Sequence, residues 1–160
     1  MKAAFTLNGA QVEVDVEPRT TLADCIRHVV RKTGTHLSCE HGVCGACTVI
    51  LNGEAVRSCL MLAVQAEGAD LVTVEGIADG DDLSPLQASF KKHNALQCGF
   101  CTPGMITTAH ALLSSEPDAD EARIREVISG NLCRCTGYVP IIEAILDAKA
   151  AYQSDAGAAQ

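Results

Sequence analysis

Cysteine is the residue type whose number and spacing in this chain could support chemistry, since nine occur in 160 residues. A first group of four comprises Cys39, Cys44, Cys47 and Cys59. The spacing C-x4-C-x2-C, followed by a more distant cysteine, is typical of a [2Fe–2S] cluster, whose two irons need four thiolates. Gly42 and Gly45 would let the backbone curl around such a cluster and bring N–H groups close to its sulfurs. A zinc knuckle and a disulfide pair are the alternatives, but zinc usually takes two C-x2-C hooks, and here the first is stretched.

A second group of four cysteines lies further along the chain and comprises Cys98, Cys101, Cys133 and Cys135. Each pair comes shortly before a predicted helix. A helix N-terminus offers unpaired N–H groups and a favourable dipole to an anionic centre, and a cluster held by four thiolates is anionic. C-x2-C combined with C-x-C is unusual for zinc and awkward for disulfides. The pattern therefore favours a second [2Fe–2S] cluster, with a structural zinc as the alternative.

Three further residues resemble metal ligands or lie between them, but we do not predict them to bind metal. Cys25 lies on an apolar helix face and is predicted to be a small core residue. His41 lies inside the first cysteine loop, but four cysteines already suffice for that cluster. Arg134 stands between two cysteines of the second group, and its positive charge should raise the reduction potential of a cluster beside it.

The N-terminal half has the pattern of a small sheet crossed by one helix. Strands are predicted at residues 2–7, 11–16, 48–51, 54–58 and 71–74. Asn8-Gly9 and Asn52-Gly53 separate two pairs of these strands, and Asn-Gly is the strongest short hairpin signal. Thr21 is the predicted N-cap of the helix and Gly34 its C-terminal stop. The apolar face of this helix comprises Leu22, Cys25, Ile26, Val29 and Val30. With a metal loop at the sheet edge, this is a β-grasp arrangement.

The C-terminal half is helical. Ser84 and Thr102 each precede a proline and are predicted as helix N-caps. Asp118 or Asp120 opens a third helix, and Pro140 begins a fourth.

We therefore predict an α+β protein. A plant-type ferredoxin-like [2Fe–2S] domain spans residues 1–76, and a linker spans 77–84. A four-helix-bundle [2Fe–2S] domain spans 85–153, and a flexible tail spans 154–160.

Composition and charge narrow the choice of partners and compartment. The formal net charge is −8, and there is no basic run, so nucleic acid is not an expected partner. No apolar stretch is long enough to cross a bilayer. The strand pattern begins directly after Met1, which leaves no room for a signal peptide. Nine cysteines without such a signal indicate a reducing compartment, and we expect the cytoplasm.

Three runs that contain the cysteines are CEHGVCGACT at residues 39–48, QCGFCTPG at 97–104 and GNLCRCTGY at 130–138. They resemble the molybdenum hydroxylase family, which includes xanthine dehydrogenase, aldehyde oxidoreductase and aerobic carbon monoxide dehydrogenase. The resemblance covers roughly residues 2–152, includes all eight ligand positions, and is to the separate small iron–sulfur subunit.

The resemblance implies an electron-transfer subunit of an oxidoreductase, with no catalytic residue or substrate site on this chain. Electrons would leave a molybdopterin-type molybdenum cofactor on a large subunit, pass through both clusters and reach FAD on a medium subunit. The assembly would be a heterotrimer or its dimer. The second cysteine group would hold the molybdenum-side cluster and the first group the flavin-side cluster. Gln97 would hydrogen bond the pterin, and Cys135 would be the ligand nearest its edge.

Two other functions fit the cysteines: a free-standing two-cluster ferredoxin and a zinc-binding interaction module. The sequence has no phosphate-binding glycine motif and no acid–base or nucleophile constellation, which agrees with a relay role. The substrate stays open, since purines, N-heteroaromatics, aldehydes, CoA thioesters and carbon monoxide are all compatible with the resemblance.

Overall fold

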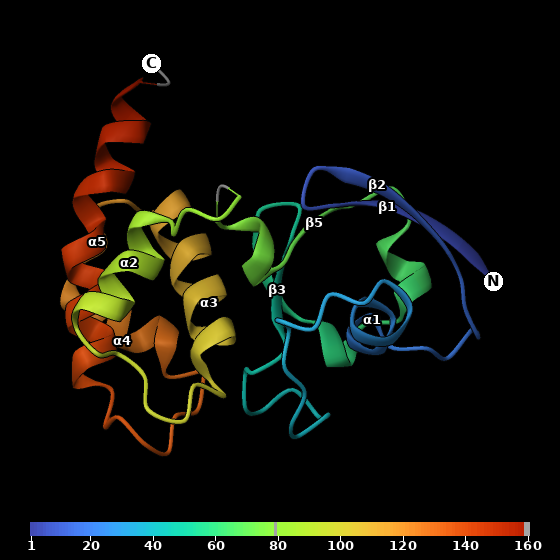
Figure 1. Ribbon diagram of the computed structural model, residues 1–160, viewed down its shortest axis with the longest axis horizontal. Coiled ribbons are helices and arrows are strands. Elements are labelled where there is room, and N and C mark those ends of the chain that lie inside the picture. Colours follow the sequence, from blue (N-terminus) through green and yellow to red (C-terminus); the bar gives the residue numbers. More distant parts are fainter. Residues whose placement is uncertain (79, 159–160) are drawn as a thin grey trace.

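The computed structural model describes residues 1–78 and 80–158, of which residues 155–158 are described by their backbone alone. Figure 1 shows a sheet with its crossing helix on one side of the molecule and a group of helices on the other. This is the α+β arrangement that the sequence predicts.

The sheet has five strands in the order β2-β1-β5-β3-β4. Their bounds are Lys2–Leu7 for β1, Ala10–Asp15 for β2, Thr48–Leu51 for β3, Glu54–Arg57 for β4 and Asp70–Val72 for β5. Strand β1 pairs parallel with β5, and the other neighbours are antiparallel. Strand β5 lies between the two hairpins β1–β2 and β3–β4, and this arrangement confirms the β-grasp prediction.

Both Asn-Gly turns form as predicted. Asn8 and Gly9 have φ angles of 50° and 80°, and Asn52 and Gly53 have φ angles of 49° and 89°. Two consecutive residues with positive φ make the type I′ turn, whose twist matches that of the flanking strands. The strands β2 and β4 each end one residue before the predicted boundary.

The helix that crosses the sheet is shorter and wider than predicted. It begins as α1, Leu22–Asp24, with Thr21 as its N-cap, and continues as a π-helix, η1, over Cys25–Val29. The wider π turn, in which the Val30 N–H donates to the Cys25 carbonyl, rotates Val29 away from the core. Val29 is 47% exposed, so its predicted place on the apolar face is wrong.

The end of this helix also differs from the prediction. Arg31 adopts the left-handed conformation with φ of 66°. The Lys32 N–H closes the turn by donating to the Ile26 carbonyl. Arg31 therefore takes the place that the sequence suggested for Gly34.

One core lies between this helix and the sheet, and Cys25 is fully buried in it as predicted. Its largest fully buried side chains are Phe5, Leu22, Ile26 and Leu71.

Four helices make the second half, and their bounds are Pro85–Lys92 for α2, Thr102–Ser115 for α3, Glu121–Ile128 for α4 and Val139–Ala158 for α5. Short 3-10 turns also occur at Ser58–Leu60 (η2), Ala63–Ala66 (η3) and Val74–Gly76 (η4).

The caps of the first three long helices test the predicted starts. Ser84 caps α2 in a capping box with Gln87, and Asp120 caps α4. The cap predicted at Thr102 is wrong, because Cys101 takes the N-cap position of α3 and Thr102 lies in the first turn.

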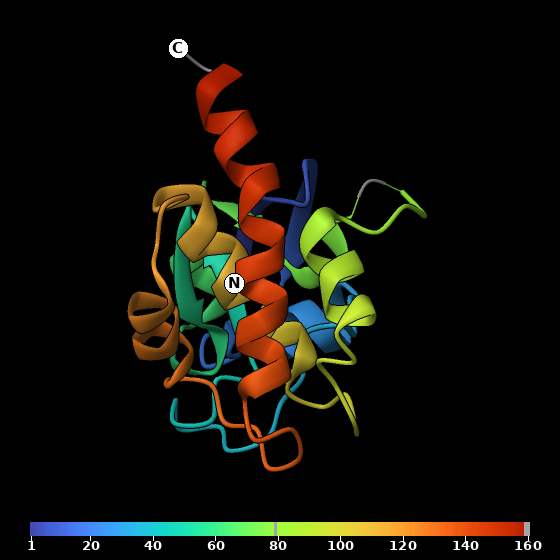
Figure 2. The same ribbon diagram turned by 90° about the vertical axis from the view of Figure 1, so that its left-hand side faces the viewer.

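Helix α5 runs past the predicted start of the tail at residue 154, and residues 159–160 lie outside the described part of the chain. Figure 2 shows this helix projecting beyond the body of the molecule. The flexibility of the tail stays a prediction.

The helical half has a core of its own, built on side chains such as Leu86, Phe90, Met105, Ile124 and Ile145. Helix α3 also packs against β3 of the sheet, so the halves touch. The loops before β3, α3 and α5 lie along the same lower edge in Figures 1 and 2. Among the helices in the described part of the chain, none is long and apolar enough to span a membrane.

Candidate metal centres

The first cysteine group is built from the loop before β3 and from the turn after β4. Cys47 and Cys59 are buried, whereas Cys39 and Cys44 are half-buried. Gly42 and Gly45 have φ angles of +84° and +75°, as the curled loop requires.

Side chains at these two glycines would also meet neighbours. A Cβ on Gly42 would lie 2.5 Å from the Leu60 side chain, and a Cβ on Gly45 would lie 2.7 Å from the Asn131 side chain. The loop therefore needs glycine for both conformation and space.

Backbone N–H groups point at the sulfur of Cys39. They come from His41 first and then from Cys44, and they hold the pKa of the Cys39 thiol at about 6. The Cys44 N–H lies 3.4 Å from Cys39 Sγ. Such a ring of donors stabilises negative charge on sulfur, which is what a metal-bound thiolate needs.

The other two thiols of the first group form a buried pair. Burial, and then the adjacent Cys47 side chain, raise the pKa of the Cys59 thiol to about 11. Two close, buried thiols resist losing both protons, so this pair becomes anionic only with a cation to compensate.

The second group joins the loop before α3 to the loop before α5. Cys98 and Cys135 are exposed, and their sulfurs lie 3.6 Å apart. Cys101 and Cys133 are half-buried, and burial followed by the Cys133 side chain raises the pKa of Cys101 to about 12. Cys101 stands directly at the start of α3, as predicted, whereas α5 begins only at Val139.

A local donor set surrounds Cys133. Burial opposes its ionisation, but hydrogen bonds from the Thr136 hydroxyl and N–H lower the pKa of Cys133 overall. The two Thr136 atoms lie 3.1 and 3.5 Å from the sulfur. The Tyr138 hydroxyl accepts from the Cys133 N–H at 2.9 Å and donates to the Asn131 carbonyl at 3.3 Å. Tyr138 thus holds the loop closed with its own backbone at φ of 69°.

All eight predicted ligands therefore occur in neighbouring pairs: Cys39 with Cys44, Cys47 with Cys59, Cys98 with Cys135, and Cys101 with Cys133. Among the described residues, no three His, Cys, Asp or Glu side chains gather closely enough to hold a single ion. A [2Fe–2S] cluster gives each of its irons two protein ligands. Two pairs of thiols in each group are the donor set that such a cluster takes.

The other residues singled out in the sequence lie apart from these pairs or at their rim. Gln97 and Arg134 are exposed beside the second group. The His41 ring contacts the Cys39 carbonyl within the loop. His110 packs in the helical half, where its ring lies 2.6 Å from the Tyr152 hydroxyl oxygen.

The structure also brings to the site residues that the sequence analysis did not identify. Asn131 and Arg57 bridge the two cysteine loops, and the Tyr138 hydroxyl closes one of them. Nothing in the spacing of Asn131 and Arg57 indicated these roles, because their contacts join segments far apart in the chain.

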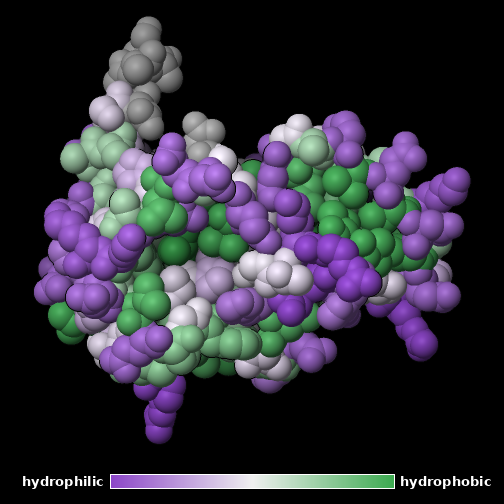
Figure 3. All heavy atoms as spheres, viewed as in Figure 1, coloured by the Kyte–Doolittle hydropathy of each residue, from purple (hydrophilic) through white to green (hydrophobic). Residues whose placement is uncertain are grey.

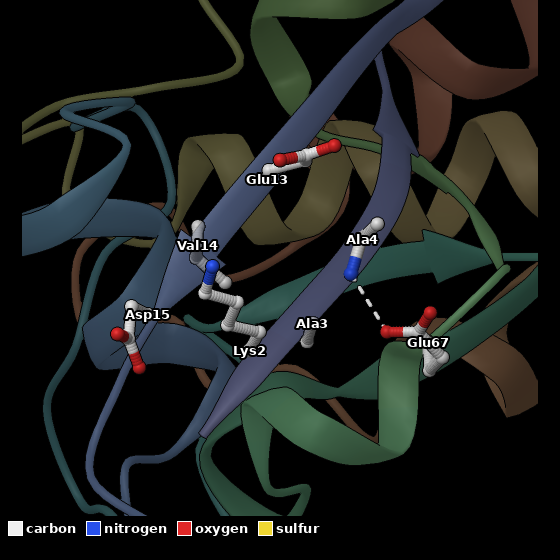
Figure 4. A pocket seen from close by; sticks show the side chains of 7 residues that line it. All are labelled: Lys2, Ala3, Ala4, Glu13, Val14, Asp15 and Glu67. Atoms are coloured by element: carbon white, nitrogen blue, oxygen red, sulfur yellow. Dashed lines mark hydrogen bonds between the residues drawn. The ribbon is translucent and has the colours of Figure 1, made fainter.

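A hollow elsewhere on the surface adds no candidate chemistry. A cavity of about 360 Å³ lies beside the β1–β2 hairpin, and its polar groups are Lys2, Glu13, Asp15 and Glu67. Figure 4 shows Glu67 accepting a hydrogen bond from the Ala4 N–H, so this side chain satisfies a backbone donor of β1. On the face of the molecule that Figure 3 shows, exposed hydrophobic residues occur in several places among hydrophilic residues.

Two domain families match this chain. Residues 5–73 match the 2Fe-2S iron-sulfur cluster binding domain, and residues 73–146 match the [2Fe-2S] binding domain. Together they contain all eight paired cysteines.

The chain is similar along most of its length to proteins that are named as enzyme subunits. It is 54% identical to the nicotine 6-hydroxylase small subunit of Paenarthrobacter nicotinovorans, over 89% of this chain and 86% of that protein. It is also 54% identical to caffeine dehydrogenase subunit gamma of Pseudomonas sp. (strain CBB1), over 89% of this chain and 87% of that protein.

A solved structure gives the same result for the fold. Quinoline 2-oxidoreductase from Pseudomonas putida 86 contains a chain that superimposes with a TM-score of 0.93 at 51% identity. The match covers 96% of each chain.

Proposed function

The chain belongs to the molybdenum hydroxylase family, as a small electron-transfer subunit with two [2Fe–2S] clusters, and we propose that its four cysteine pairs hold them. The flavin-side cluster is assigned to Cys39, Cys44, Cys47 and Cys59. The molybdenum-side cluster is assigned to Cys98, Cys101, Cys133 and Cys135. The observation that carries this assignment is the pairing of all eight thiols inside two domains of [2Fe-2S] families, which favours clusters over zinc.

When bound, a [2Fe–2S] cluster takes up and gives back one electron at a time. The chain contributes the setting for this exchange. N–H groups aimed at Cys39, together with the Thr136 donors at Cys133, stabilise negative charge on the ligand sulfurs. Hydrogen bonds to the sulfurs are among the factors that set reduction potentials.

The names of the relatives, "small subunit" and "subunit gamma", indicate a multi-subunit complex. We propose a large subunit with a molybdopterin-type cofactor and a medium subunit with FAD as the partners, in a heterotrimer or its dimer. Gln97 is proposed to contact the pterin, with Cys135 as the nearest ligand. The exposure of Gln97, Cys98 and Cys135 supports this, because the second group reaches the surface where a partner could approach.

We also propose an N-heteroaromatic substrate for the complex. Nicotine, caffeine and quinoline, which name the relatives, are all nitrogen heterocycles. Turnover of quinoline but not of a simple aldehyde by the purified complex would support this, and the reverse preference would contradict it.

The domain division and the location remain proposals. Two separate cores support a ferredoxin-like domain over residues 1–76, a linker over 77–84 and a helical domain over 85–153. None of the nine cysteines, all of which lie in the described part of the chain, forms a disulfide, which suits a reducing compartment such as the cytoplasm.

Two matched cysteine substitutions test the ligand assignment. Cys47 and Cys25 are both buried, but only Cys47 belongs to a proposed ligand pair. We expect Cys47→Ala to lose the iron and sulfide of one cluster, and Cys25→Ala to keep the full complement of both. Iron and sulfide analysis of the purified proteins measures this. Equal iron contents in the two variants would refute the assignment.

A further inference from the structure

The side chain of Asn131 joins the two halves of the molecule between the cysteine groups. It is only 1% exposed, and it lies two residues before Cys133. Its Nδ2 donates to the Gly45 carbonyl at 3.0 Å, and Gly45 follows Cys44 in the first loop. Its Oδ1 accepts from the Thr108 hydroxyl of α3 at 3.1 Å and from Arg57 Nη2 of β4 at 3.2 Å. One amide therefore contacts three segments.

The backbone beside Asn131 makes parallel contacts. The Leu132 N–H donates to the Cys44 carbonyl at 2.8 Å, and Arg57 Nη2 donates to the Gly130 carbonyl at 2.6 Å. Leu132 and Asn131, which precede Cys133 of the second group, therefore hydrogen bond Cys44 of the first group and the adjacent Gly45.

The segments around Asn131 are packed so closely that a side chain at either Gly104 or Gly45 would not fit. A Cβ on Gly104, in the first turn of α3, would lie 2.3 Å from the Gly45 carbonyl oxygen. A Cβ on Gly45 would lie 2.7 Å from both the Asn131 side chain and the Gly130 carbonyl. Helix α3 starts beside Cys101, so this contact also fixes a ligand of the second group.

The hydrogen bonds of the buried Asn131 amide explain why the two cysteine loops stay in contact. The Thr108 hydroxyl donates to the buried amide, and losing the amide would remove this acceptor from a side chain that is only 4% exposed. A satisfied buried polar network specifies one arrangement of the surrounding segments.

We propose that Asn131 is a positioning residue that fixes the distance and relative orientation of the two cysteine groups. It thereby sets the strength of the coupling between the two clusters. This inference rests on the proposed ligand assignment.

The test uses EPR of the fully reduced holoprotein. Each reduced cluster has one unpaired spin, and the magnetic splitting between two spins falls steeply with their separation. We expect Asn131→Ala to keep the iron content of the wild type and to lose the resolved splitting. Ser89→Ala is the control, because Ser89 is 5% exposed and donates to the Ala144 carbonyl inside the helical half, away from the junction. It should keep the splitting.

A second variant perturbs the same contact by addition. Gly104→Ala places a methyl group against the Gly45 carbonyl, so α3 must move away from the first loop. We expect a weaker splitting than in the wild type.

The outcomes separate this inference from the proposed function. Splittings that stay at the wild-type value in both variants would overturn the inference and leave the two clusters standing. Loss of iron from Asn131→Ala would also overturn it, because Asn131 would then be needed for loop folding. A wild-type protein without two spin signals would overturn the proposed function, and the inference with it.

Discussion

Thiols within one group differ in how readily they ionise. N–H groups hold the pKa of Cys39 at about 6, whereas burial beside Cys47 raises that of Cys59 to about 11. Because the thiolate is the form that binds metal, Cys39 is closer to the ligand form than Cys59. The same contrast separates Cys133, whose pKa is lowered, from Cys101, whose pKa is raised to about 12.

A titratable residue away from the cysteines gives a pH prediction. Burial lowers the pKa of His110 in the folded protein. As the pH falls below about 6.5, the unfolded chain binds this proton first, so the free energy of unfolding decreases. The effect of His110 on the pH dependence fades over about one pH unit above that value. Replacement by a residue that does not titrate, His110→Gln, should remove this part of the slope.

Denaturant unfolding of wild type and His110→Gln between about pH 7 and pH 5 measures the difference. Asp147 stays ionised throughout this range, because hydrogen bonds from Lys92, Ser89 and His93 lower its pKa to about 2. It therefore does not contribute to the pH dependence of the free energy of unfolding. Identical slopes for the two proteins would show that His110 titrates alike in both states.

At the scale of single elements, the caps of α2 and α3 make a matched pair. The Ser84 hydroxyl accepts from the Gln87 N–H at 3.3 Å, so Ser84→Ala should cost about 1 kcal/mol of stability. The Thr102 hydroxyl lies in the first turn of α3 and is buried without a hydrogen-bond partner among the described residues. Thr102→Ala should therefore leave the free energy of unfolding unchanged or raise it.

Chemical denaturation of the two holoproteins compares these costs. A larger loss for Thr102→Ala than for Ser84→Ala would mean that Thr102 is the true cap, as its place before proline had suggested.

The elements that the sequence predicted well are those with local signals. Asn8-Gly9 and Asn52-Gly53 determine their hairpins through positive φ angles, and Ser84 determines its helix start through a neighbouring glutamine. The spacing of the eight cysteines likewise predicted two groups, and the fold brings their members together in pairs, whereas their role as ligands stays a prediction.

What escaped prediction depends on contacts that spacing does not encode. The π-helix over Cys25–Val29 keeps a helical apolar pattern while turning Val29 outward. Asn131 looks like a polar residue after a helix, and only the folded chain places Gly45 beside it, 86 residues away in sequence.

At the scale of the whole molecule, the two halves are held together by more than their linker. Apart from the Asn131 junction, the His36 ring lies 2.8 Å from the Phe100 carbonyl, and helix α3 packs against β3. We therefore expect a holoprotein cut by protease at a site engineered between residues 80 and 84 to elute as one species. Two separate peaks on size exclusion would show that the contacts between the halves are too weak to hold without the covalent link.

The most direct test of two clusters on one small electron carrier is EPR on the purified wild-type holoprotein, with metal analysis of the same sample. We expect two distinct signals after full reduction and two irons for each cluster, without zinc. A colourless protein that contains zinc, or a single signal with half of that iron in a fully loaded sample, would contradict it.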